Sequence, residues 1–162
     1  MTTYFVTPCG AAKAAAPAPA SELYVSATFR HYLAAAMAEA EATRQDLGHD
    51  VEVLILSAKH GLLGLAEMVA PYDVTMTDAE AISAEALRDQ LVARGMDWDD
   101  EVYAMLPKKY LARLEEAAWD ATYGVPRVLV FDVYEAAPGI GYQRGVASCL
   151  LRKLKTPSNT SR

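Results

Sequence analysis

Residues 51–57, VEVLILS, are the stretch that decides the fold of this chain. Their run of valine, leucine and isoleucine is the strongest strand pattern in the sequence. The strand leads directly into Ser57, Lys59 and His60, after which residues 61–64, GLLG, are apolar again. Packing alone gives no reason for a hydroxyl, an ammonium and an imidazole at a strand end, so this elbow is a candidate functional site.

Strands and helices alternate on both sides of this stretch. Further strands are predicted at residues 2–7, 101–106 and 127–133. Helices are predicted from Ser21 to about residue 47, from Thr77 or Asp78 to residue 94 with Gly95 as the stop, from Pro107 to about residue 120, and from about Gly141. This alternation predicts an α/β fold, a three-layer sandwich with a mainly parallel sheet of about four strands. We expect a single α/β domain over residues 1–154 and a polar tail over 155–162.

Length, charge and cysteine content narrow the class of protein. The 162 residues suffice for one core, and the net charge of −6 argues against general, charge-driven binding to nucleic acid. No apolar run approaches the roughly 18 to 20 residues that span a bilayer, and no secretion signal is visible. Cys9 and Cys149 are far apart, which favours reduced thiols. We therefore expect a cytoplasmic protein without membrane contact. Its histidines and cysteines show no metal-ligand spacing, so we expect no metal, and we expect no cofactor either.

Polar or glycine-rich segments follow all four predicted strands. The carboxyl ends of parallel strands meet at one edge of the sheet, where such folds bind ligands. Four segments far apart in the sequence therefore point to one rim. Its candidate residues are Cys9, Gly10 and Lys13 after the first strand, Ser57, Lys59 and His60 after the second, Lys108, Lys109 and Tyr110 after the third, and Gly139, Gly141, Gln143 and Arg144 after the fourth.

Each of these segments also has a purely structural interpretation. Lys59 and His60 could be solvated residues of a turn, Cys9 a small buried residue, and Lys108 and Lys109 a solvated helix start. Residues 11–20, AAKAAAPAPA, suggest a flexible lid or a plain linker. The glycines of residues 139–145, GIGYQRG, look like a phosphate loop, but a dinucleotide motif should follow the first strand rather than the last.

Five segments carry a resemblance to a known family: PCGAAK, SELYVSATFR, LILSAKHGLL, APYDVTM and GIGYQRG, in this order. Together they resemble a small phage and bacterial family of unknown function with LSAKYGLL, PYD and GIGxQ motifs. This chain differs from that pattern at Pro8, where a serine is usual, and at His60, where a tyrosine is usual. The LSA-GLL and PY signature is also distantly similar to the YaaA peroxide-stress family, whose members are linked to DNA protection and DNA binding.

The resemblance implies a link to 7-deazaguanine bases in DNA, and hence cleavage or exchange of an N-glycosidic bond. Such chemistry needs a carboxylate at the sugar carbon and an acid for the departing base. Asp73 of the PYD motif is the candidate carboxylate, with Glu22 as the alternative, and His60 or Lys59 would supply the proton. The expected ligand-binding residues are Cys9, Lys13, Ser57, Tyr72, Tyr110, Gly139, Gly141 and Gln143. Asp73 could instead close a turn by bonding its own backbone.

Two other classes of function remain open from the sequence. One is a nucleic-acid-binding or DNA-protection protein without catalysis, for which a local basic rim on an acidic body would be needed. The other is a nucleotide-binding sensor or a subunit of a larger assembly. The expected partners are a nucleobase, a nucleoside or DNA, and these classes leave room for a partner protein.

Overall fold

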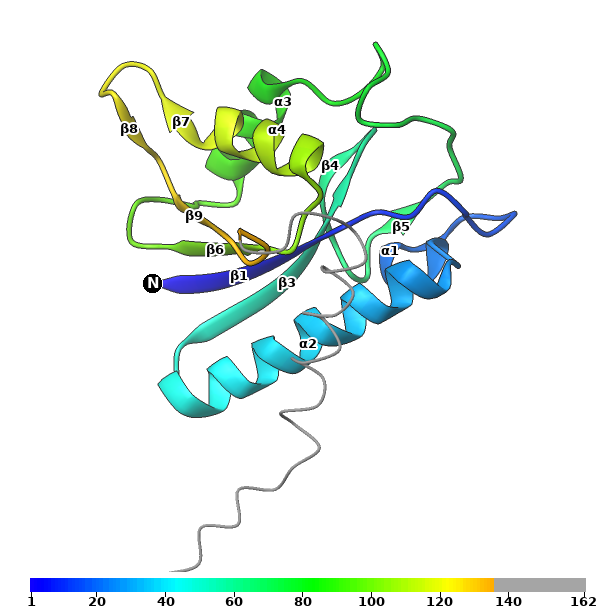
Figure 1. The fold of residues 1–162 in the computed structure, drawn as a ribbon, viewed down its shortest axis with the longest axis horizontal. Helices are drawn as coiled ribbons and strands as arrows, with labels where there is room; N and C mark the ends of the chain where they lie inside the picture. Colours follow the sequence, from blue (N-terminus) through cyan, green and yellow to red (C-terminus); the bar gives the residue numbers. More distant parts are fainter. Residues whose placement is uncertain (136–162) are drawn as a thin grey trace, which may run out of the picture.

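The central element is a five-stranded sheet with the order β4-β3-β1-β6-β9, in a computed structural model that describes residues 1–135 (Figure 1). Four of its strands are parallel, and β4 pairs antiparallel with β3. The α/β class and the mainly parallel sheet are thus confirmed. The strands are β1 (Thr2–Pro8), β3 (Asp50–Ser57), β4 (Gly61–Gly64), β6 (Glu101–Ala104) and β9 (Leu129–Asp132).

The fifth strand explains why the sheet exceeds the predicted four. The apolar residues GLLG return along β3 as a hairpin, with Ser57 opposite Gly61 and Leu56 opposite Leu62. Gly61 has a φ of 74°, a left-handed conformation that glycine adopts without a steric penalty. The polar elbow of the sequence is therefore the turn of a β-hairpin.

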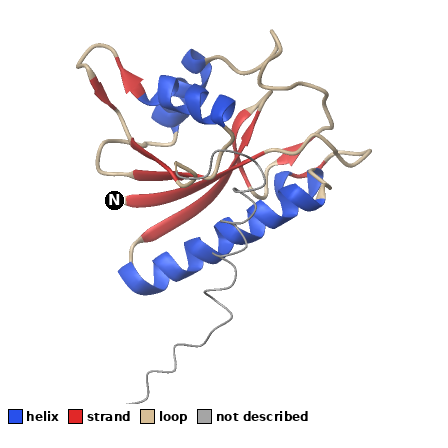
Figure 2. Ribbon diagram, in the orientation of Figure 1, coloured by secondary structure: helices blue, strands red, loops and turns tan. Residues whose placement is uncertain are grey.

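Helices cover both faces of the sheet (Figures 1 and 2). Helix α2 (Ala27–Leu47) packs on one face, and α3 (Ala84–Ala93) and α4 (Lys108–Ala118) pack on the other. Successive side chains of β1 alternate between the two faces, as in any strand. Phe5 joins the core under α2, whereas Tyr4 and Val6 join the core under α3 and α4.

The first long helix begins later than predicted. A short helix α1 (Ala20–Leu23) ends before Tyr24, and α2 starts after Ser26, whose side-chain oxygen accepts a hydrogen bond from the Phe29 N–H at 3.1 Å. Ser21 is therefore not the cap. The break occurs because Tyr24 is extended, forms a β-bridge with Lys13 and is fully buried.

The second predicted helix start, at Thr77 or Asp78, is also wrong. The Asp78 carboxylate accepts the Thr75 N–H at 2.6 Å and closes a turn instead. Helix α3 begins after Ser83, whose hydroxyl oxygen accepts the Ala86 N–H. Gly95 follows the helix with a φ of 70°, which agrees with its predicted role as the stop.

Short strands fix the remaining loops. Strand β2 (Ala18–Pro19) pairs with β5 (Met68–Val69), so the alanine- and proline-rich segment is tied to the loop after β4 and is not a free linker. Strands β7 (Trp119–Asp120) and β8 (Val125–Pro126) form a second hairpin ahead of β9. Among residues 1–135, no helix combines the length and apolar character that crossing a membrane requires.

Candidate functional site

The ends of β1 and β3 bring Cys9 and Ser57 to one edge of the sheet. The two strands are parallel and in register, with Pro8 opposite Leu56, and the Cys9 N–H donates to the Leu56 carbonyl at 3.1 Å. Two of the residues predicted to share one rim, Cys9 and Ser57, thus lie at neighbouring strand ends. Gly139, Gly141, Gln143 and Arg144 lie outside the described residues.

A chain of three hydroxyl groups occupies this edge. The Tyr72 hydroxyl lies 2.6 Å from the Ser57 hydroxyl and 2.6 Å from the Tyr24 hydroxyl. The Ser57 oxygen also accepts the backbone N–H groups of His60 at 3.0 Å and Lys59 at 3.2 Å. With these two N–H groups bound to its oxygen, the Ser57 hydroxyl can donate its own proton to Tyr72. Tyr72 in turn can donate to Tyr24.

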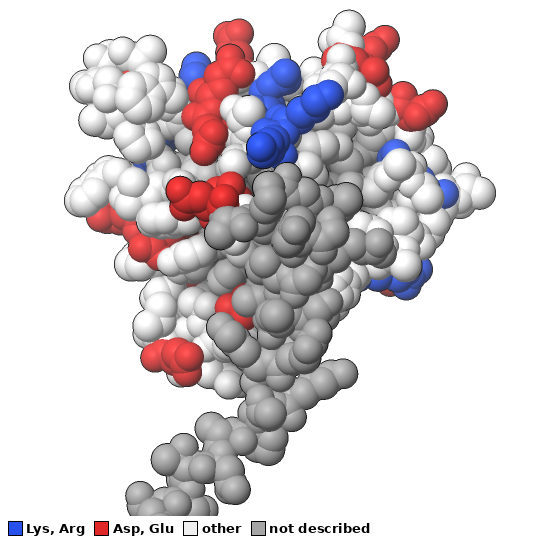
Figure 3. All heavy atoms as spheres, in the orientation of Figure 1, with Lys and Arg blue, Asp and Glu red and all other residues white. Residues whose placement is uncertain are grey.

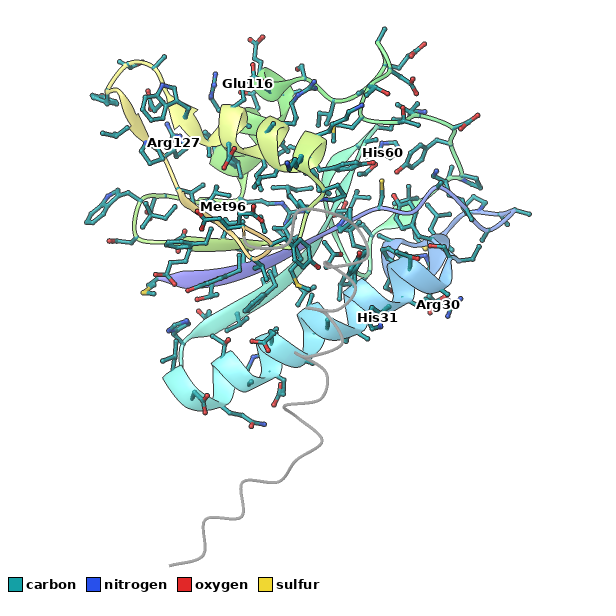
Figure 4. All side chains as sticks on the ribbon, in the orientation of Figure 1. Arg30, His31, His60, Met96, Glu116 and Arg127 are labelled. Atoms are coloured by element: carbon teal, nitrogen blue, oxygen red, sulfur yellow. The ribbon has the colours of Figure 1, made fainter. Side chains whose placement is uncertain are left out.

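Three basic side chains surround the ring of Tyr72. The Lys13 ammonium lies 4.3 Å from the ring centre and the Lys59 ammonium 6.0 Å from it. The His60 ring meets the Tyr72 ring edge-on at a centroid distance of 5.2 Å, and Figure 4 shows His60 beside the β3–β4 hairpin. An ammonium at these distances is attracted by the negative face of an aromatic ring. Tyr72 is thus the centre of the cluster.

Burial sets the protonation states at this centre. It raises the pKa of Tyr72, with a further contribution from Cys9, and so keeps the phenol neutral. Burial also lowers the pKa of His60 below its usual 6.5, and the positive charge of Lys59 adds to this effect. At neutral pH the imidazole is therefore uncharged and able to accept a proton.

The Cys9 thiol contacts a tyrosine hydroxyl at the start of α4. Its sulfur is 3.4 Å from the Tyr110 hydroxyl, and the thiol is free and half-buried. Burial, followed by Cys9, raises the pKa of Tyr110, and Cys9 also contributes to the raised pKa of Tyr24. The thiol therefore connects the tyrosine cluster to the first turn of α4.

Two hollows flank this cluster. The switch-point pocket, of about 350 Å³, lies beyond the end of β1, between the loop that follows this strand and the starts of α2 and α4. It is lined by Pro8, Cys9, Gly10, Ala11, Ala12, Ser26, Thr28, Phe29, Tyr32, Pro107 and Tyr110. The hairpin pocket, of about 380 Å³, is lined by Lys59, His60, Leu62, Leu63, Glu67, Met68, Val69, Ala70, Pro71 and Gln90. Both volumes lie within the range of small-molecule sites.

Four sequence candidates stand apart from the cluster. Asp73 is exposed, and its carboxylate makes no hydrogen bond or ion pair with any residue of 1–135, so the alternative in which it closes its own turn is not seen there. Glu22 is exposed on α1. Lys108 and Lys109 are exposed in the first turn of α4, and Figure 3 shows Lys and Arg side chains gathered over this helix.

Sequence reasoning missed the roles of Tyr24 and Gln90. Gln90 on α3 accepts the Leu62 N–H at 2.8 Å and donates to the His60 carbonyl at 2.7 Å, which holds the hairpin turn in place. No pattern around Gln90 signals this role. Tyr24 carried a signal, since it lies in one of the five family-like segments. No group of His, Cys, Asp and Glu side chains suited to a metal ion occurs in the described part of the chain.

The chain matches one family model, described as a family of unknown function (DUF6884), over residues 4–127. The match covers more than half of the chain and includes every described residue of the cluster, from Cys9 to Tyr110. No curated protein matches the chain.

Proposed function

We propose that this chain, which belongs to the family of unknown function DUF6884, is a nucleobase- or nucleoside-processing enzyme that acts on an N-glycosidic bond. The observation that carries the proposal is the convergence of Lys13, Lys59 and His60 on the ring of Tyr72 at the carboxyl edge of the sheet. Breaking such a bond requires groups that stabilise a departing base and donate protons, and this cluster supplies them.

The proposed reaction proceeds in two displacements. The Asp73 carboxylate forms a bond to the sugar carbon C1′ while the bond from C1′ to the base breaks, and the electron pair leaves with the base. The Lys59 ammonium donates a proton to the departing nitrogen. An incoming base then bonds to C1′ as the bond to Asp73 breaks, and it loses a proton to His60. His60 then releases its proton to solvent and Lys59 takes one up, which restores both groups. The net result is exchange of one base for another, without an oxidant or a reductant.

Protonation states support this division of labour between Lys59 and His60. The imidazole has a lowered pKa and is neutral at pH 7, so it serves as a base rather than an acid. The ammonium of Lys59 is the neighbouring cation that contributes to this lowering. Two groups with such different charges can serve as acid and base in one cycle.

Asp73 is suited to its proposed role by its position beside Tyr72. Tyr72 is anchored by two hydroxyl contacts, whereas the exposed Asp73 carboxylate has no partner among residues 1–135. An uncommitted carboxylate in the residue directly after a fixed aromatic side chain can reach a ligand without breaking a protein contact. The ring of Tyr72 can stack on a base or sugar, and Lys13 can pair with a phosphate.

The test is base release and base exchange by the purified protein. Labelled guanine and 7-deazaguanine-type bases are offered with duplex DNA, single-stranded DNA and free deoxynucleosides, and incorporation of label is followed. We expect incorporation on at least one of these substrates and its loss in a Lys59→Met, His60→Gln double variant that still folds. Absence of release and exchange on all of them would refute the enzyme proposal.

A non-catalytic nucleic-acid-binding protein is the second candidate, and one observation favours it. Lys108 and Lys109 are exposed in the same helix turn that presents Tyr110 to Cys9, so cations extend beyond the cluster. Phosphate contacts make log affinity fall linearly with log salt. A steep salt dependence for DNA without turnover would indicate this function, whereas tight binding of free nucleotides without DNA affinity would indicate a sensor.

A further inference from the structure

The switch-point pocket lies where the connections of the sheet change direction. Strand β1 is connected through α2 to its neighbour β3, whereas β6 is connected through α4 to β9 on the opposite side. β1 and β6 are adjacent, so the crevice between their carboxyl ends is a topological switch point. Ligands of open α/β sheets bind at this place.

The wall of the pocket is apolar and rich in rings. Pro8 is the last residue of β1, Pro107 is the N-cap of α4, Phe29 comes from α2 and Tyr110 from α4. None of the described residues that line it is charged. A neutral planar ring fits such a wall, whereas a phosphate would be left without a counter-charge.

Two polar groups lie together on this wall. The Cys9 sulfur and the Tyr110 hydroxyl are 3.4 Å apart, and both belong to the lining. Burial raises the pKa of Tyr110, so its hydroxyl keeps a proton that it can donate. A flat ring that enters between the prolines and Phe29 would present its polar edge to this pair.

The charged part of a ligand has a separate place close by. The Lys13 ammonium donates to the carbonyl of Ala11, a residue that lines the pocket, at 3.1 Å, and it lies 4.3 Å from the centre of the Tyr72 ring. A ligand with a neutral ring and an anionic group can therefore put its ring in the pocket and its anion at Lys13. A nucleotide is a ligand of this kind, with a neutral base and an anionic phosphate.

We infer that the switch-point pocket holds the base of the substrate, a purine-type ring, with Cys9 and Tyr110 at its polar edge and Lys13 at the sugar-phosphate. This inference rests on the proposed function and names the place of the base within that site. Gly10 lines one side of the pocket and is tightly packed there: a Cβ would meet the Ser26 hydroxyl at 3.3 Å and Tyr24 at 3.3 Å. The loop after β1 can therefore pack closely against the start of α2 without filling the pocket.

The first test fills the pocket from an exposed lining position. Ala12→Trp places a bulky ring at its mouth, and Ala15→Trp puts the same ring at an exposed position of the same loop that lines neither hollow. Binding of deoxyguanosine monophosphate and of deoxyribose 5-phosphate to the full-length chain is measured by calorimetry. We expect Ala12→Trp to weaken the nucleotide at least about tenfold and the sugar phosphate less than about twofold. Ala15→Trp should leave both affinities unchanged.

The second test uses the thiol as a footprint in the unsubstituted protein. The rate at which Cys9 reacts with methyl methanethiosulfonate is followed by peptide mass, which separates Cys9 from Cys149. Saturating nucleotide should slow the reaction of Cys9 about tenfold or more, and deoxyribose 5-phosphate should not. The inference would be overturned if the nucleotide bound Ala12→Trp as tightly as it binds wild type and failed to protect Cys9 in the unsubstituted protein. Protection of Cys9 without base exchange would instead support the pocket and refute the proposed reaction.

Discussion

The Tyr72 hydroxyl lies 2.6 Å from the hydroxyl of Ser57, the last residue of β3, and this contact joins two loops that the sequence separates. The same Ser57 oxygen accepts the N–H groups of Lys59 and His60. The serine therefore orders the hairpin turn and, through its contact with Tyr72, the ring around which the basic side chains gather. This one contact therefore links the hairpin turn to the geometry of the basic cluster.

Removal of the Tyr72 hydroxyl should destabilise the fold without removing the ring. Tyr72→Phe leaves the hydroxyls of Ser57 and Tyr24 without this partner, and both residues are fully buried. We expect the free energy of unfolding in urea to fall by about 1–3 kcal/mol. Tyr123→Phe is the matched control, since Tyr123 is 78% exposed and should show no change. Equal midpoints for both variants would contradict the role assigned to Tyr72.

Alanine should destabilise the fold more at Gly61 than at Gly48. Both glycines have a positive φ, 74° and 66° respectively. A Cβ at Gly61 would collide with the Gln90 amide and with Ile82, whereas one at Gly48 would meet nothing within 4 Å. Gly48→Ala should cost about 1–2 kcal/mol of stability from backbone strain alone, and Gly61→Ala about 3 kcal/mol or more. Urea unfolding measures both, and similar losses would contradict the packing described around the hairpin.

The sequence could predict those parts of the fold that leave a clear local signal, and it missed those whose signal is short or that depend on tertiary contacts. The period of apolar residues identified the four parallel strands, and Gly95 was identified as a helix stop, because these signals are local. The hairpin return at Gly61 was missed, since GLLG is too short to distinguish a strand from a loop. The late start of α2 depends on a contact outside the helix, the bridge from Tyr24 to Lys13. The late start of α3 follows from a local turn, in which the Asp78 carboxylate accepts the Thr75 N–H.

The candidate site was predictable in its place but only partly in its members. The rule that parallel strands present ligands at their carboxyl ends placed Cys9 and Ser57 together, and the register of β1 and β3 has them there. The position of Lys13 over Tyr72 depends on the path of the loop that β2 and β5 tie together. Pairing of two-residue strands leaves no periodic signal in a sequence.

His60 should make stability depend on pH in a known direction. Its pKa is lowered in the folded protein, so between the usual value of 6.5 and the lower folded value the unfolded chain binds more protons. Stability must therefore fall as the pH falls through this window. We expect wild type to lose more stability than His60→Gln between about pH 7.5 and about pH 5. Urea unfolding at each pH measures the difference.

Lys59 provides the control for this pH dependence. Its charge contributes to the lowered pKa of His60, second to burial. Lys59→Met should therefore reduce the extra loss of stability at low pH, while leaving a part that comes from burial. A loss at low pH that is equal in wild type, His60→Gln and Lys59→Met would assign it to other groups.

Lys13 should contribute to anion binding rather than to folding. Its ammonium lies over Tyr72 and donates one hydrogen bond, to the Ala11 carbonyl. We expect Lys13→Met to weaken deoxyguanosine monophosphate about tenfold and to reduce the salt dependence of its binding. Stability should change by only about 0.5–1 kcal/mol, the size of an exposed cation–π contact. Lys109→Met, at an exposed position of α4, should retain the affinity for the nucleotide. Equal losses of affinity in both variants would indicate a general electrostatic attraction of the anion rather than a specific contact with Lys13.

Asp73 is the residue on which the proposed reaction depends most. Asp73→Asn keeps the size of the side chain and removes the charge that, in the proposed reaction, attacks the sugar carbon. Because the carboxylate has no described partner, the fold and nucleotide affinity should be unchanged. Base exchange should fall by roughly a thousandfold or more, as for loss of an attacking group. Glu80→Gln, another exposed acid of the same loop, should retain full activity. Exchange within about fivefold of wild type in Asp73→Asn would move the carboxylate role elsewhere, and Glu22→Gln would then be tested in the same assay.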